Sequence, residues 1–184
     1  MAFYRGEDGL VKFGSTSADI TALANGDLCV ILTTGDSNFT LIGAADSNPG
    51  TIFSATGAGV GSGTAAKTGT VASTRSWSLT LDKSILETTS MGDTHATNVG
   101  SIISGSGTVE LFYTGGTGET NNFVERVNTG NADDLVVFEL FLDGSTKKVF
   151  FRGVPTSTEL TSTVGDISIV TVNFVTSGSV SLSI

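Results

Sequence analysis

Cysteine, histidine and proline are nearly absent from this sequence. Among 184 residues there are one cysteine, one histidine and two prolines. One cysteine forms no intramolecular disulfide, and a structural zinc ion needs more cysteine and histidine ligands than the chain holds. Cys29 lies within the apolar run 28–32, which is typical of a small buried side chain. The sequence therefore predicts no disulfide framework and no cofactor.

Basic side chains are also few. The chain has nine Lys and Arg against 18 Asp and Glu, and its formal net charge at pH 7 is −9. A protein that grips nucleic acid neutralises phosphates with clustered basic side chains, and this chain has no such surplus. An acidic wall repels phosphate, so the same balance suits a protein past which DNA moves without specific binding.

Long apolar runs are missing as well. Residues 1–13 contain no apolar segment of the kind that forms the core of a signal peptide. No apolar run approaches the roughly 18 residues that span a membrane. We therefore expect a chain that is made in the cytoplasm and has no membrane partner.

Glycine, serine and threonine dominate what is present. The sequence has 24 Gly, 22 Ser and 28 Thr, which together make about 40% of the chain. Strong helix formers are scarce, which excludes a helical bundle. The hydrophobic fraction of 39%, with 11 Phe, is enough to build a core and excludes a disordered chain. The composition predicts an all-β fold with many turns.

Period-two alternation marks the strands. In residues 75–82, Trp77, Leu79 and Leu81 share one face and are candidate core residues. Similar patterns predict a hairpin in residues 2–14, a hairpin turn at 143–144, and strands at 27–33, 51–55, 108–113, 135–142, 147–152, 167–175 and, short and terminal, 180–184.

The remaining segments predict little helix and one long loop. Residues 121–127 predict a short α-helix, with Thr120 or Asn121 as its N-cap and Gly130 just past its end. Residues 38–43 predict a single helical turn. Residues 86–100 break the alternation and predict a long loop.

The strand at 135–142 is apolar on both faces. Phe138 and Leu140 lie on one face and are candidate core residues, while the opposite face carries Val137 and Phe141 around Glu139. A solvated face is not this apolar. We expect a further element, such as the helix or a neighbouring subunit, to cover it.

Catalytic constellations are lacking. His95 is the only histidine, and Ser104 and Ser106 lie in a glycine–serine repeat without a nucleophile-elbow motif. The paired carboxylates Asp133 and Asp134 suit a turn better than acid–base chemistry. Aspartates scattered through residues 15–69 leave a calcium site as an open alternative, although they have no EF-hand spacing. We expect no enzyme.

Several segments, taken in order, resemble the major tail tube proteins of long-tailed (siphovirus-type) bacteriophages. The resemblance is carried by residues 1–13, 71–83, 86–89, 92–94, 104–111, 151–154, 164–166 and 176–178. It covers residues 1–14 and 70–184, and it implies a β-sandwich or barrel of the tail tube type. It also implies hexameric rings that stack into a hollow tube in the virion tail, with tape measure, tail terminator and distal tail proteins as partners.

Residues 15–69 interrupt this resemblance, because the family pattern joins the two flanking parts through a short link. Segments 39–44 and 50–57 resemble a small module that recurs in marine phage structural proteins. We expect an inserted β-rich subdomain that faces outward from the tube. The alternative is one long arm packed on a neighbouring subunit.

The resemblance also implies which residues would act. The long loop corresponds to an inter-ring contact loop, with Glu87, Thr88, Thr89, Gly92, Asp93, Thr94 and His95 as candidates. Glu110 and Glu139 alternate with apolar neighbours and are candidate lumen carboxylates, the alternative being ordinary solvent-facing strand charges. Two other functions stay open: a virion decoration or carbohydrate-binding β-sandwich module, and a type VI secretion-like tube protein.

Overall fold

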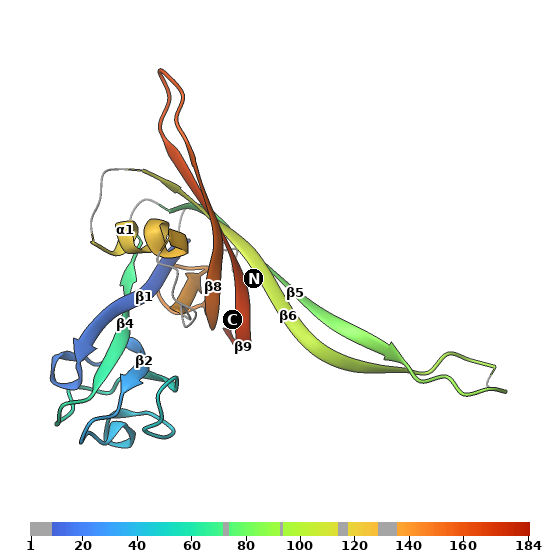
Figure 1. Ribbon diagram of the computed structural model, residues 1–184, viewed down its shortest axis with the longest axis horizontal. Coiled ribbons are helices and arrows are strands. Elements are labelled where there is room, and N and C mark those ends of the chain that lie inside the picture. The colour runs from blue at the N-terminus through green and yellow to red at the C-terminus, as the bar shows by residue number, and fades with distance from the viewer. Residues whose placement is uncertain (1–8, 72–73, 93, 114–117, 129–135) are drawn as a thin grey trace.

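The computed structural model describes residues 9–71, 74–92, 94–113, 118–128 and 136–184, and in them the all-β prediction is confirmed (Figure 1). One antiparallel sheet has the strand order β3-β2-β4-β1-β7-β8-β9-β6-β5. Its strands are β1 Leu10–Asp19, β2 Leu28–Thr33, β3 Ile52–Ser54, β4 Thr64–Thr70, β5 Thr74–Glu87, β6 Asn98–Phe112, β7 Val136–Phe141, β8 Lys148–Thr161 and β9 Ile169–Ser183. The described helices are α1 Gly118–Glu125 and the short 3₁₀ turns Ile20–Ala22, Phe39–Ile42 and Arg126–Asn128.

The main core lies on one face of the sheet, beneath α1. Phe138 and Leu140 of β7 are fully buried there, and Phe123 brings α1 onto the same face. The Phe138 ring stacks on that of Phe151 at 5.2 Å between centroids, and Phe13 meets Phe123 edge-on at 4.9 Å. Such ring contacts add to the area that the side chains bury, so α1 holds the centre of the sheet.

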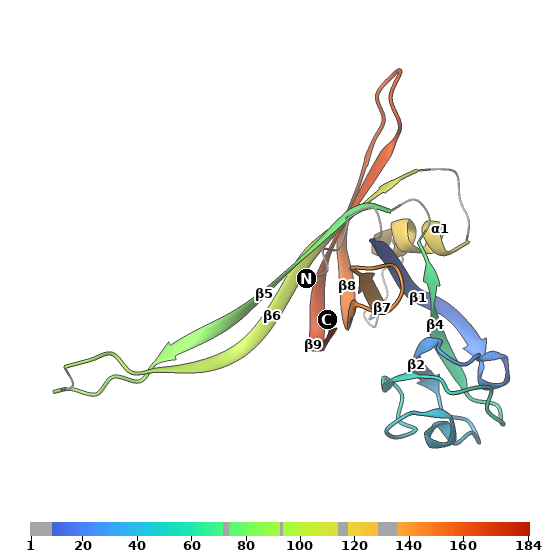
Figure 2. The same cartoon turned by 180° about the vertical axis from the view of Figure 1, so that it is seen from behind.

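Residues 15–69 have a core of their own. Phe39 and Phe53 pack edge-to-face at 5.8 Å between ring centroids, among Ile20, Cys29 and Ile31. The predicted helical turn at 38–43 is present as the 3₁₀ turn Phe39–Ile42. A small lobe therefore forms beside the main core (Figures 1 and 2).

This lobe covers the second apolar face of β7. Val137 packs in a buried cluster with Leu28 and Val30 of β2 and with Ala66 of β4. The cover thus comes from residues 15–69 of the same chain, whereas we expected the helix or a neighbouring subunit.

The lobe is continuous with the main sheet. β1 runs through residues 14 and 15, and β4 runs through residues 69 and 70. Both ends of the predicted subdomain 15–69 therefore fall within strands. The register of β1 against β4 shifts between Phe13 and Thr16, which is where the chain passes from one core to the other. Backbone pairing therefore ties the lobe to the sheet.

Three predicted elements need correction. The helix begins at Gly118, so Thr120 and Asn121 lie inside it and are not its N-cap. The strands at 167–175 and 180–184 are one strand, β9, in which Gly178 has a φ of 84° beside a register shift. The loop predicted at 86–100 is too long, because β5 and β6 stay paired as far as Glu87 and Asn98.

Other predictions fall partly outside the described residues. The first arm of the hairpin at 2–14 and the helix-terminating Gly130 lie there, while the second arm is the start of β1. Trp77 and Leu79 are half-buried against the main core. Leu81, which we expected in that core, is 39% exposed because it pairs with Gly105 of β6, just beyond Ser106, where the pairing of β6 with β9 ends.

Candidate functional site

Two long hairpins leave the body of the molecule in different directions (Figures 1 and 2). The β5–β6 hairpin stays paired from Thr74 opposite Leu111 to Glu87 opposite Asn98. Trp77 anchors its base, where the indole Nε1 donates a hydrogen bond to the Phe141 carbonyl at 3.2 Å. The β8–β9 hairpin ends in the turn after Thr161. An isolated two-stranded ribbon is marginally stable in water, so each hairpin is a surface that lacks a partner in the monomer.

The outer part of the β5–β6 hairpin is apolar and exposed. Its exposed large apolar side chains are Ile85, Leu86, Met91, Val99, Ile102 and Ile103. Soluble monomers rarely expose so many apolar side chains on one element, and such surfaces mark contacts with other molecules. The hairpin is therefore the strongest candidate interaction surface in the described part of the chain.

Most of the predicted contact-loop residues lie at the end of this hairpin. Thr89 donates its hydroxyl to Glu87 Oε1 at 2.8 Å and accepts the Thr97 N–H at 3.1 Å, which closes the turn. Gly92 has a φ of 102°, a conformation that favours glycine. Thr88, Thr94 and His95 are exposed beside them, and Asp93 lies outside the described residues.

The β8–β9 hairpin is a second exposed surface that we did not predict. Leu160, Val164 and Ile167 are exposed at its end. The turn is ordered by Asp166, whose Oδ1 accepts the N–H of Ile167 at 2.7 Å. The available signal was the threonine-rich segment 156–163, whose residue types favour extended backbone.

Glu139 is not a lumen carboxylate. Its side chain is 2% exposed, and its Oε1 lies 2.5 Å from Lys148 Nζ. The Thr68 hydroxyl of β4 donates to Oε2 at 2.8 Å. The alternation that predicts an outward side chain is present, but residues 15–69 cover that face, so Glu139 cannot line a channel.

Glu110 is placed differently. Its side chain is 37% exposed on β6, 3.8 Å from Arg75 Nη1, and it accepts the Ser76 hydroxyl at 2.9 Å. Both partners lie on β5, the edge strand of the sheet. Glu110 therefore stays partly accessible to solvent beside this edge.

The described residues hold no evident reactive centre. Burial raises the pKa of the Cys29 thiol to about 12, and Asp27 adds to this effect, so the thiol is un-ionised at neutral pH. No group of three or more His, Cys, Asp or Glu side chains in that part of the chain could hold a metal ion. None of the described helices has the length and apolar character needed to cross a membrane.

The fold is similar to that of chains in phage-like particles. A chain in the virion of the native gene transfer agent particle is 12% identical, over 64% of this chain and 89% of that one, with a TM-score of 0.53. A chain in the tail of the empty gene transfer agent particle, solved with C6 symmetry, is 12% identical over 64% and 87%, with a TM-score of 0.54. The sequence matches no protein-family model and no curated protein. At this identity the likeness shows a shared fold.

Proposed function

We propose that this chain is a non-enzymatic structural subunit of a phage-like tail. In this proposal six copies form a ring, and rings stack into a hollow tube through which DNA passes during ejection. The observation that carries it is the shared fold with a chain of a C6-symmetric tail. The resemblance of residues 1–14 and 70–184 to phage tail tube proteins points independently to the same assembly.

The exposed surfaces suit such an assembly. β5 is an edge strand of 14 residues, and an unpaired edge can extend its sheet by pairing with another chain. The outer, apolar part of the β5–β6 hairpin extends away from the body of the molecule (Figure 1). Contacts of unlike surfaces generate rings when the rotation closes. Edge pairing would then close the ring, and the hairpin would contact the next ring.

Charge supports the passage of DNA. Six copies carry a formal charge of about −54, which disfavours adhesion of the phosphate backbone. Glu110 on β6 is the proposed lumen carboxylate, because it is partly exposed and lies next to the edge strand. Residues 15–69 are proposed to face outward. The subunit would belong to the virion tail, with tape measure, tail terminator and distal tail proteins along and at the ends of the tube.

Electron microscopy of the purified protein tests this proposal. We expect stacked sixfold rings with a central channel, and Glu110 lining that channel in the density. A protein that stays monomeric at high concentration would contradict it. Binding to glycans by such a monomer would instead favour the decoration or carbohydrate-binding module.

A further inference from the structure

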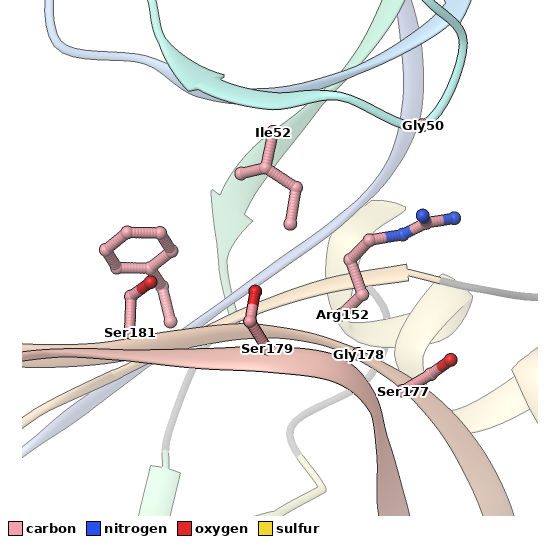
Figure 3. A pocket seen from close by; sticks show the side chains of 8 residues that line it. Gly50, Ile52, Arg152, Ser177, Gly178, Ser179 and Ser181 are labelled. Atoms are coloured by element: carbon pink, nitrogen blue, oxygen red, sulfur yellow. The ribbon is translucent and has the colours of Figure 1, made fainter. Parts of the chain in front are cut away.

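An open cavity of about 380 Å³ lies where the lobe meets the outer surface of β8 and β9 (Figure 3). Its lobe side consists of Gly50 and Ile52. Its sheet side consists of Phe150, Arg152, Ser177, Gly178, Ser179 and Ser181. Residues far apart in the sequence therefore build one polar cavity with two apolar side chains in its wall.

A β-bulge shapes the floor of this cavity. Phe151 pairs with Val180 and Arg152 pairs with Ser177, so Gly178 and Ser179 are extra residues in β9. Gly178 has a φ of 84°, which favours glycine at this position. Bulges redirect side chains and recur beside functional sites. Here the bulge presents serine hydroxyls beside the Arg152 side chain (Figure 3).

The lobe is shaped around the guanidinium group. Gly50 has a φ of 91°, and a Cβ built on it would lie 3.1 Å from Arg152 Nη1. The turn is held by the Gly50 N–H, which donates to the Ile31 carbonyl at 2.7 Å, and by the Thr51 N–H, which donates to the Asn48 carbonyl at 3.1 Å. The hydrogen-bonded turn at Gly50 thus leaves room for the Arg152 side chain and accepts no hydrogen bond from its guanidinium.

The positive charge of Arg152 has no carboxylate partner among the residues that the structure describes. Other cations in the described part of the chain have carboxylate partners there, among them Lys67 with Asp27, Arg75 with Glu110, and Lys148 with Glu139. Arg152 makes no hydrogen bond or ion pair with any residue that the structure describes, and the residues lining the cavity include no Asp or Glu. Arg152 is half-buried and lines the cavity, to which its guanidinium offers a fork of donors.

We propose that this cavity binds a carboxylate side chain of a second copy of this chain; this rests on the proposed function. A guanidinium fork matches the two oxygens of a carboxylate, and charge-assisted bonds of this kind are the strong ones. The apolar Ile52 and Phe150 beside it limit competition from water. The chain has 18 acidic residues and net charge −9, so copies bring many carboxylates to a contact, whereas a nucleic acid would be repelled.

The test compares full-length wild type with Arg152→Gln and Arg152→Lys. Assembly is measured by sedimentation velocity and electron microscopy over a range of protein concentrations. We expect Arg152→Gln to raise the concentration needed for assembly by about tenfold or more, and Arg152→Lys to fall between the two because it keeps the charge and loses the fork. The melting temperatures of all three monomers should agree.

Sodium acetate, compared with sodium chloride at equal ionic strength, is the second arm. We expect acetate to inhibit assembly of wild type beyond the chloride effect and to have no such extra effect on Arg152→Gln.

Assembly of Arg152→Gln at the wild-type concentration would overturn the inference and leave the proposed function standing. A lower melting temperature of the Arg152→Gln monomer would point to a partner within the chain, and no extra effect of acetate on wild type would exclude a carboxylate; either result overturns the inference. If wild type forms no rings, the proposed function fails and this inference fails with it.

Discussion

Glu139 of β7 and Lys148 of β8 form an ion pair beneath the lobe, with 2.5 Å between Oε1 and Nζ. Thr68 of β4 donates a hydroxyl hydrogen bond to the same carboxylate at 2.8 Å. Lys148 Nζ also lies 5.4 Å from the centroid of the Phe141 ring. Three strands thus meet at one buried carboxylate, which ties the lobe to the central sheet.

Removing this carboxylate should destabilise the monomer. Glu139→Gln leaves Lys148 without an anion, and breaking a buried ion pair costs about 3–5 kcal/mol. The Lys148 side chain is 24% exposed, so hydration recovers part of this loss. We expect the free energy of unfolding to fall by about 2–3 kcal/mol in urea titrations.

Glu110→Gln is the matched control. Glu110 also pairs with a cation, but its side chain is 37% exposed, and such surface pairs contribute about 0–1 kcal/mol. Equal losses in the two variants would show that burial adds nothing to the Glu139 pair. The paired replacement Glu139→Leu with Lys148→Met should recover most of the stability, because no charge is left without a partner.

The sequence predicted the strands whose side chains enter the main core. Alternation located Trp77 and Leu79, and the run around Phe138 located the centre of the sheet. It could not show what covers Val137, because that depends on β1 and β4 continuing across residues 14–15 and 69–70. The outward prediction for Glu139 was wrong for the same reason.

The hairpins were harder to predict than the core. Where β5 leaves the sheet, Ile85 and Leu86 are adjacent and both exposed, so the period-two pattern ends although the pairing continues to Glu87. On β8 the segment beyond Pro155 is polar except for Leu160 and has no period-two pattern. A period-two pattern arises where one face of a strand is buried within the monomer. The outer parts of the two hairpins bury neither face, so their sequences carry no such pattern.

The turn at Asp143 should make stability depend on pH in the acid range. Its carboxylate accepts the Thr146 hydroxyl and the backbone N–H groups of residues 145–147, which lowers the pKa of Asp143 well below its ordinary value. A lowered folded-state pKa contributes stability that is present above the unfolded value of about 3.9 and is lost as pH falls through the folded value.

We therefore expect Asp143→Ala to melt at a lower temperature than wild type at pH 7, with the gap closing as the pH drops below about 4. Thermal scans from pH 7 downward measure this. Asp82→Ala, which removes an exposed carboxylate from β5, is measured alongside as the control. A gap for Asp143→Ala that is constant with pH would mean that packing, and not the charge, holds the turn.

The single thiol should be unreactive in the folded protein. Cys29 is fully buried in the core of the lobe, and burial raises the pKa of its thiol to about 12. Because the thiolate is the reactive form, a disulfide reagent such as DTNB should label native protein slowly at pH 8 and label it fully in denaturant. Rapid labelling without denaturant would show that the lobe opens independently of the main sheet, against the continuity of β1 and β4.

The apolar β5–β6 hairpin should control assembly without affecting the monomer. Met91 is fully exposed and Ile102 is 74% exposed, so serine at both positions removes little buried contact from the isolated chain. Burying a large apolar side chain at an interface is worth about 1.5–3 kcal/mol, and every 1.4 kcal/mol is a factor of about ten in affinity. The double variant Met91→Ser and Ile102→Ser should therefore need at least about tenfold more protein to form rings, with an unchanged melting temperature.

Leu41→Ser is the control, because Leu41 is similarly exposed but lies on the lobe. If Leu41→Ser impairs assembly and the hairpin variant does not, the lobe carries the contact between subunits and the proposed roles of the two surfaces are reversed.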